Sequence, residues 1–264
     1  ALKGVSVDGH KYIDKAVENG ASAVLVSKNI ELKHNVDYIL IENLREKLGV
    51  IASNFYGHPD KKLKIVGVTG TNGKTTTTYI IEELLGTDKV ARIGTVEYKI
   101  GDEIIEAPNT TPESLDIIKM SKKAVDKGLE YLIMEVSSHG LTSGRVDMLT
   151  FNAGVFTNLT PEHLDYHKDF KEYRDVKKLF FDQLPKTAFA LTNADDKNGD
   201  VMLQNTVARK YSYAAKTVAD YKVQILENQF QGLLLKINNQ ELWVKLIGNF
   251  NAYNLLAIYA TAEL

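Results

Sequence analysis

The sequence predicts an α/β fold, in which a central, mostly parallel β-sheet of the P-loop type carries helices on both faces and follows part of a smaller α/β domain. Two observations predict this fold. From residue 63 onward, short apolar runs alternate with helical patterns, as in sheets built from strand–helix–strand units. The first of these strands is joined to its helix by a glycine-rich turn, which is typical of a phosphate-binding loop.

Residues 1–62 are predicted to form part of a small N-terminal α/β domain. The apolar spacing predicts four elements, which are helices over 11–19 and 44–56 and strands over 23–26 and 38–41. The second helix is stopped by Gly57-His58-Pro59, and Lys61-Lys62 follow it. We therefore expect the domain boundary at residue 62.

Residues 63–264 are predicted to form the central domain. Its expected strands are 63–68, 90–93, 131–136, 153–157 and 188–192, and its expected helices are 75–85, 113–127, 170–184 and 251–264. Residues 94–107 suit a hairpin, and 218–247 suit short strands with turns at Glu227-Asn228 and Asn238-Asn239. The chain does not begin with methionine, and its last helical pattern is not terminated, so we expect a fragment of a longer protein.

Composition excludes several classes of function. The 264 residues are 44% hydrophobic and 25% charged, which is ordinary for a globular protein. A net charge of −2 gives no basic surface for nucleic acid or anionic membrane. The absence of cysteine excludes disulfides and thiolate metal sites. No apolar run suits a membrane span and no signal peptide is visible, so we expect a cytoplasmic protein without membrane insertion.

The turn after strand 63–68 carries the strongest chemical signal. Its glycines let the backbone approach an anion, and the following helix start directs N–H groups at it. Lys74 is expected to reach the β- and γ-phosphates, and the Thr75 hydroxyl to bind Mg²⁺. The strict motif has glycine at position 68, where this chain has Val68, so the loop is a variant. The expected nucleotide-binding residues are Gly70, Thr71, Asn72, Gly73, Lys74, Thr75 and Thr76.

Polar residues at the ends of later strands point to the same site, because ligands of such sheets bind at the carboxyl ends of the strands. Glu135 interrupts an apolar strand near its end and suits a Mg²⁺ ligand, or a carboxylate that accepts hydrogen bonds from neighbouring backbone amides. The polar turn Ser137-Ser138-His139-Gly140 faces the same crevice, and His163, after the next strand, suits a metal or phosphate ligand. Lys177 and Lys178 lie about 100° apart on a helix, so at most one points into a site, and the residues alone favour both being solvated.

Two further segments suit a substrate. Asn109-Thr110-Thr111-Pro112 precedes a helix, where capping explains a threonine and the proline, although three polar side chains also suit a sugar or peptide. Arg145 in a polar loop suits a bidentate clamp on a carboxylate, or a surface position. Thr192-Asn193-Ala194-Asp195 resembles the guanine-reading loop of small GTPases but lacks its lysine, which argues against a GTP switch.

Taken together, these motifs resemble the Mur ligase family, the ATP-dependent amino-acid-adding enzymes of peptidoglycan synthesis. Loop 70–75 is shared with folylpolyglutamate synthetases, whereas 109–112 and 134–141 resemble the MurE branch. The resemblance implies two Mg²⁺ sites, with Thr75, Glu135, His163 and a carbamylated Lys177 as ligands, and catalytic roles for Lys74, Lys177 and His163. It also implies that Asn109, Thr110, Thr111, Ser137 and Arg145 hold the substrate and that Asn251 and Asn254 lie near the adenine.

The implied reaction phosphorylates the D-glutamyl carboxylate of UDP-MurNAc-L-Ala-D-Glu with ATP, after which the amine of the third amino acid attacks the acyl phosphate. That amino acid is meso-diaminopimelate, favoured as the commoner choice, or L-lysine. We expect a monomer that lacks the C-terminal ligase domain and the start of the first domain, so that this chain alone is inactive. The alternatives are a MurF-like ligase, against which turn 137–140 argues, and a non-catalytic P-loop nucleotide-binding module.

Overall fold

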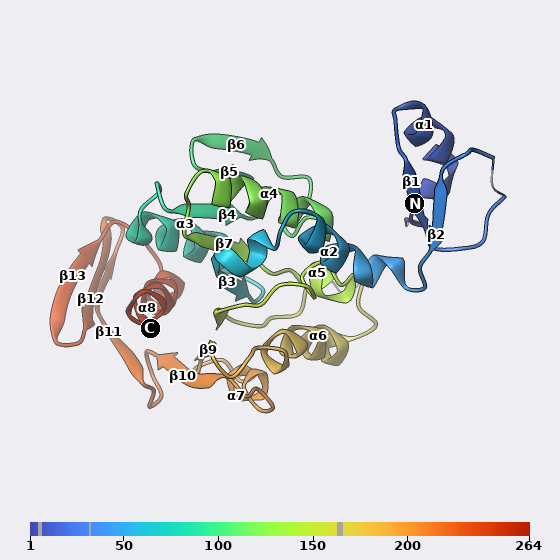
Figure 1. Cartoon of the computed structure of the whole chain (residues 1–264). Coiled ribbons are helices and arrows are strands. Elements are labelled where there is room, and N and C mark those ends of the chain that lie inside the picture. Colours follow the sequence, from blue (N-terminus) through green and yellow to red (C-terminus); the bar gives the residue numbers. More distant parts are fainter. Residues whose placement is uncertain (5–6, 32, 163–165) are drawn as a thin grey trace.

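The computed structural model describes residues 1–4, 7–31, 33–162 and 166–264, and its main feature is an 11-stranded sheet (Figure 1). The strand order is β13-β12-β11-β10-β9-β8-β3-β7-β4-β5-β6. These strands are β3 (Lys64–Thr69), β4 (Val90–Ile93), β5 (Glu97–Ile100), β6 (Glu103–Glu106), β7 (Tyr131–Glu135), β8 (Ala153–Phe156), β9 (Phe189–Asn193), β10 (Arg209–Ala214), β11 (Tyr221–Gln229), β12 (Gly232–Ile237) and β13 (Gln240–Val244).

The centre of the sheet is parallel, and antiparallel strands extend both of its edges. Strands β10, β9, β8, β3, β7 and β4 run in one direction, whereas β5 and β6 at one edge and β12 and β13 at the other are paired antiparallel. In the parallel register, Val68 lies opposite Glu135 and Thr69 opposite Phe156. The polar segments that follow β3, β7 and β8 therefore meet at one edge. The predicted fold class is confirmed.

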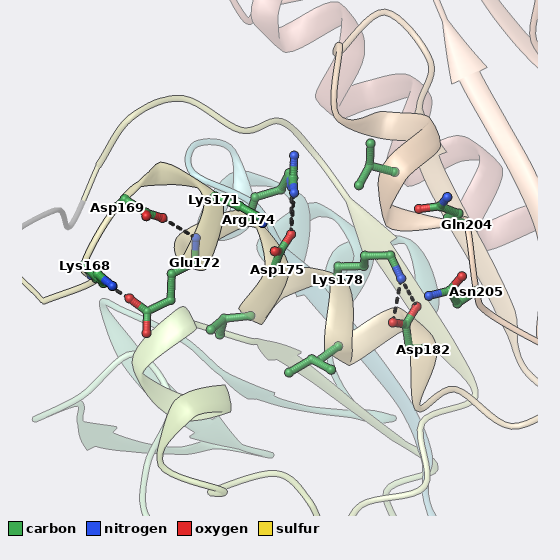
Figure 2. Close-up of a pocket in the computed structure, with 13 residues that line it drawn as sticks. Lys168, Asp169, Lys171, Glu172, Arg174, Asp175, Lys178, Asp182, Gln204 and Asn205 are labelled. Carbon is green, nitrogen blue, oxygen red and sulfur yellow. Dashed lines mark hydrogen bonds and ion pairs between the residues drawn. The ribbon is translucent and has the colours of Figure 1, made fainter.

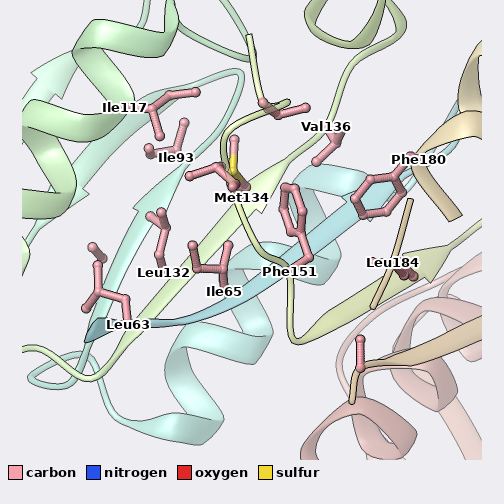
Figure 3. Packing of buried hydrophobic residues seen from close by; sticks show 14 of the residues in the cluster. Leu63, Ile65, Ile93, Ile117, Leu132, Met134, Val136, Phe151, Phe180 and Leu184 are labelled. Atoms are coloured by element: carbon pink, nitrogen blue, oxygen red, sulfur yellow. The ribbon is translucent and has the colours of Figure 1, made fainter. Parts of the chain in front are cut away.

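Helices cover both faces because alternate residues of the central strands are apolar on opposite sides. Ile65 packs in one core with residues of α2 (Leu44–Phe55), α4 (Ser114–Asp126) and α6 (Phe170–Asp182) (Figure 3). Val66 and Val68 pack in a second core with residues of α3 (Lys74–Leu85) and α8 (Asn249–Glu263). The first strand of the loop motif is thus fixed from both sides.

The N-terminal elements form a small unit with its own apolar cluster. They are η1 (Gly9–Tyr12), α1 (Ile13–Glu18) and the parallel pair β1 (Ala23–Val26) and β2 (Asp37–Leu40), and Figure 1 shows them apart from the main sheet. Ile13, Val24 and Val26 make the cluster. Helix α2 leads onward to η2 (Pro59–Lys62), and its Ala52 belongs to the core of the main sheet.

Most predicted elements are confirmed to within two residues. The predicted turn at Asn238-Asn239 is also confirmed, with positive φ angles of 49° and 63°. The exceptions have physical reasons. The turn predicted at Glu227-Asn228 is wrong, because β11 continues through these residues with a register shift after Ile225. Sequence analysis did not predict β10, α5 (Ser138–Thr142) or α7 (Gly199–Met202), of which the helices span only one turn or so. Within the described residues, no helix has the length and apolar character needed to cross a bilayer.

Candidate active site

The loop between β3 and α3 adopts a shape that depends on its glycines. Gly70 and Gly73 have φ angles of 145° and 87°, which residues with a side chain rarely adopt. A Cβ on Gly70 would lie 2.0 Å from Thr157 Oγ1, so the loop lies directly against the segment after β8. Gly73 is the N-cap residue of α3 and has no side chain that could cap the first backbone N–H groups of the helix.

The segment after β8 clamps the loop through Asn158. Its carbonyl accepts from Thr71 N (2.8 Å), its Oδ1 accepts from Asn72 N (3.0 Å), and its Nδ2 donates to Asn72 O (2.9 Å). Thr157 Oγ1 also donates to Asn72 O (2.7 Å). Two loop N–H groups are thus already bonded within the protein. The amides at the start of α3 are therefore the ones that can bind an anion.

Two lysines converge on one carbonyl of the loop. Lys74 Nζ donates to the carbonyl oxygens of Gly70 (3.1 Å) and Thr71 (2.8 Å), and Lys177 Nζ from α6 donates to Gly70 O (3.1 Å). Tyr173 supports both segments, since its hydroxyl lies 3.2 Å from Thr71 Oγ1 and its ring centroid 4.8 Å from Lys177 Nζ. Burial and then the charge of Lys74 lower the pKa of Lys177 to about 7. Burial also lowers the pKa of Lys74, against the opposing charges of Glu135 and Glu162.

The carboxylate of Glu135 is fully buried beside the start of α3. Its Oε1 accepts from Thr75 Oγ1 (2.9 Å) and from Thr95 N (3.0 Å), and its Oε2 accepts from Thr95 Oγ1 (3.0 Å). Neighbouring oxygens around Mg²⁺ lie roughly 3 Å apart, because the ion binds octahedrally at about 2.1 Å. Thr75 Oγ1 and Glu135 Oε1 therefore fit two adjacent positions of one Mg²⁺. The described residues contain no cluster of three His, Cys, Asp or Glu, and His163 lies outside them.

The residues predicted to hold a substrate meet beside Glu135. Thr111 Oγ1 donates to Glu135 O (2.9 Å) and lies 3.0 Å from Ser137 Oγ, which also caps α5. Thr110 Oγ1 lies 3.1 Å from Thr95 Oγ1. Arg145 Nη1 donates to Thr111 O (2.7 Å). Asn109 contributes its backbone carbonyl, which accepts from the Tyr98 hydroxyl.

A pocket of about 560 Å³ lies beside the glycine loop, and its size suits a nucleotide base and sugar. Asn254 lines it, whereas Asn251 is buried behind, with its Oδ1 accepting from Asn254 Nδ2 (3.2 Å) and its Nδ2 donating to Ile247 O (2.8 Å). Thr76 is half-buried in the first turn of α3. The pocket is lined by Asn72, Gly73, Asn158, Thr160, Asn193, Phe250, Tyr253 and Asn254.

A second pocket, of about 660 Å³, lies between α6 and α7 (Figure 2). Two ion pairs lie in it, Lys178 with Asp182 and Arg174 with Asp175. Lys178 thus points away from the loop that Lys177 contacts, as the helical spacing requires. The expectation that both lysines are solvated is wrong, because they are only 1% (Lys177) and 9% (Lys178) exposed.

Comparison with known proteins identifies the family. The family model described as the Mur ligase middle domain matches residues 68–262, and the model described as the Mur ligase family, catalytic domain, matches residues 1–56. The chain belongs to the Mur ligase family. A UDP-N-acetylmuramoyl-L-alanyl-D-glutamate–2,6-diaminopimelate ligase of Fusobacterium nucleatum is 47% identical to it over 99% of this chain and 54% of its own length. The chain spans about half the length of the curated relatives that it matches.

Solved structures of Mur ligases share the fold. A structure of a UDP-N-acetylmuramoyl-L-alanyl-D-glutamate–2,6-diaminopimelate ligase superposes with a TM-score of 0.82 and 28% identity, over 96% of this chain and 53% of that chain. The MurF ligase of Thermotoga maritima in complex with ADP superposes with a TM-score of 0.73 at 21% identity, over 100% and 58% of the two chains. At this identity the MurF structure supports the fold alone.

Three residues of the candidate site were not among those predicted from the sequence, namely Thr95, Asn158 and Tyr173. Thr95 and Asn158 follow β4 and β8, so the rule that ligands bind at strand ends could have found them. Tyr173 precedes Lys177 by one helical turn, and this spacing was the available signal.

Proposed function

We propose that the protein of which this chain is part is an ATP-dependent ligase of the MurE type. It joins meso-diaminopimelate to UDP-MurNAc-L-Ala-D-Glu through an acyl phosphate. The observation that carries this proposal is the convergence of Lys74, Thr75 and Glu135 beside the Thr110–Thr111 turn and Arg145. The names of relatives 38–48% identical to this chain support diaminopimelate over L-lysine and a MurE-type over a MurF-type substrate.

The residues of the loop would bind and orient ATP. The amides at the start of α3 and the Lys74 ammonium bind phosphate oxygens, since Lys74 Nζ already lies within 3.1 Å of two loop carbonyls and can turn from them to a phosphate. Arg145, Thr110, Thr111 and Ser137, with Asn109 beside them, hold the muramoyl-dipeptide so that a carboxylate oxygen faces the γ-phosphate. The catalytic advantage is orientation plus charge stabilisation.

Thr75 and Glu135 would hold one Mg²⁺, which when bound offsets negative charge on the phosphates. We also propose that His163 and a carbamylated Lys177 would hold a second Mg²⁺. The position of Lys177 supports the carbamate: its amine is buried, lies 3.1 Å from Gly70 O, and is held at a lowered pKa by burial. A neutral amine is the form that combines with carbon dioxide.

The domain division is also a proposal. Residues 1–62 would belong to the domain that binds the UDP-linked substrate, and residues 63–264 to the central ATP-binding domain, with the C-terminal ligase domain contributed by the rest of the protein. We propose a cytoplasmic monomer whose partners are its small-molecule substrates.

Phosphate release by the full-length protein tests the function. We expect release that requires ATP, Mg²⁺, UDP-MurNAc-L-Ala-D-Glu and meso-diaminopimelate together. Phosphate release with L-lysine in place of meso-diaminopimelate would show that the added amino acid is L-lysine. A requirement for the tripeptide substrate and D-alanyl-D-alanine would indicate a MurF-type ligase, and ATP binding without release on any substrate would support the non-catalytic module.

A further inference from the structure

Glu113 lies between two arginines from distant parts of the chain. Its Oε1 forms an ion pair with Arg145 Nη2 at 2.9 Å, and its Oε2 accepts from Arg45 Nη1 at 3.4 Å. Arg45 belongs to α2 and also donates to the carbonyl of Lys3 at 3.3 Å. One carboxylate therefore joins the arginine expected to hold the substrate to the N-terminal segment.

Local structure does not account for this side chain. Glu113 is the N-cap residue of α4, a position where a short polar side chain usually accepts a hydrogen bond from a helix amide. Its side chain makes no such bond and turns to the two arginines instead. The side chain is 40% exposed, so burial does not force this orientation. A residue that departs from a local rule in this way is a candidate for a functional role.

Glu113 is an imperfect partner for Arg145. The guanidinium donates from Nη1 to Thr111 O and forms an ion pair with Glu113 through Nη2, whereas its Nε–H is buried and has no acceptor among the residues that the structure describes. Arginine pairs best with a carboxylate that takes two parallel N–H groups, and a buried N–H without an acceptor is unfavourable. A carboxylate that engages two N–H groups would therefore satisfy this guanidinium better than Glu113 does.

We propose that Glu113 is an internal substitute ligand of Arg145, which its carboxylate occupies until a carboxylate of the substrate replaces it. This inference rests on the proposed function. Arg45 then keeps Glu113 paired after the exchange. While the site is empty, Glu113 keeps small anions off Arg145, because any of them must displace a tethered carboxylate. The muramoyl-dipeptide can displace Glu113 from Arg145 because Thr110 and Ser137 hold the rest of this ligand.

The test measures ligand dissociation constants by calorimetry in the full-length protein. In Glu113→Gln, UDP-MurNAc-L-Ala-D-Glu is expected to bind roughly two- to five-fold more tightly, the range given by a partly exposed ion pair. Two analogues, each with one D-glutamyl carboxyl converted to the amide, report where the exchange occurs. The analogue that lacks the carboxylate bound by Arg145 cannot replace Glu113 on this arginine. Its affinity is therefore expected to be the same for the wild-type protein and for Glu113→Gln.

The matched control is Glu103→Gln, which removes another acidic side chain of similar exposure (38%) that pairs with Lys123 on α4. No change in affinity is expected, since only the net charge differs. Arg45→Gln is expected to weaken substrate binding in the wild-type background, because Glu113 then has only Arg145, and to have no effect in the Glu113→Gln background.

Three results would overturn the inference: unchanged or weaker binding of the dipeptide substrate in Glu113→Gln, an equal gain for both amide analogues, or an equal gain in Glu103→Gln. Thermal unfolding of each variant checks that it is folded. Failure of the proposed function would look different, because the wild-type protein would then neither bind the dipeptide substrate nor release phosphate with it.

Discussion

Removal of the Asn158 side chain tests whether the glycine loop between β3 and α3 must already have its binding shape before ATP binds. Asn158→Ala deletes two hydrogen bonds, from Asn72 N to Oδ1 (3.0 Å) and from Nδ2 to Asn72 O (2.9 Å), and leaves the backbone bond to Thr71 N in place. Both lost bonds are exposed to solvent, so each is worth about 0.5 kcal/mol, at the low end of the usual range. The loop is then less stable in its binding shape by about 1 kcal/mol.

A ligand that binds one loop shape loses affinity in proportion to the population of that shape. The dissociation constant of ATP is therefore expected to rise up to about five-fold, because 1.4 kcal/mol corresponds to a factor of ten. The assay is titration of the full-length protein with ATP by calorimetry. Asn205→Ala is a matched control, because Asn205 is an exposed asparagine in the separate pocket between α6 and α7.

Asn158 also lines the pocket proposed to hold the nucleotide, so a second variant separates the effect of loop shape from that of direct contact with ATP. Thr157→Val removes the 2.7 Å bond to Asn72 O from a buried residue outside the lining of that pocket. It is expected to weaken ATP binding in the same direction. Wild-type affinity in both variants would refute the reasoning, since the loop would then hold its shape without the clamp.

Three further predictions concern charged groups. Lys74→Ala is expected to lower kcat by about 100- to 1000-fold in the phosphate-release assay, as for loss of one preorganised donor, whereas Lys178→Ala should leave it near wild type. Arg92→Leu should lower the free energy of unfolding by about 3 kcal/mol in urea titration, because the buried Glu82, now 2.6 Å from Arg92, is left with the more exposed Lys99 as its partner. An unchanged urea midpoint would contradict this. Lys177 has a folded pKa of about 7, below that of the unfolded chain, so the unfolded state binds more protons above pH 7. Stability should therefore rise with pH between 7 and 10.5, by at most about 1.4 kcal/mol per pH unit, and this rise should be absent from urea titrations of Lys177→Met.

The fold was predictable because its signals are local. Apolar periodicity and the glycine turn are contained in short windows of sequence, and they placed β3, α3 and the central strands correctly. The error at Glu227-Asn228 has a matching cause. Polar residues resemble a turn in sequence, but the pairing of β11 with β12 carries the strand through them with a shift in register.

The site was predictable only where the topology brings strand ends together. Glu135 and the glycine loop lie at such ends, so the sequence pointed to their proximity. The Asn158 clamp joins residues 86 positions apart, and the burial of Lys177 depends on the direction of α6 across the loop. Neither is a property of a short window, which is why residues alone favoured a solvated Lys177.

Glu135 also links the nucleotide side of the site to the substrate side. Thr95 Oγ1 has one proton, and it lies 3.0 Å from Glu135 Oε2 and 3.1 Å from Thr110 Oγ1. Thr95 donates this proton to Glu135, so Thr110 is the donor in the hydrogen bond between the two threonines. While this arrangement holds, Thr110 can only accept hydrogen bonds from a substrate. Glu135 thus sets the hydrogen-bonding polarity of Thr110 through Thr95.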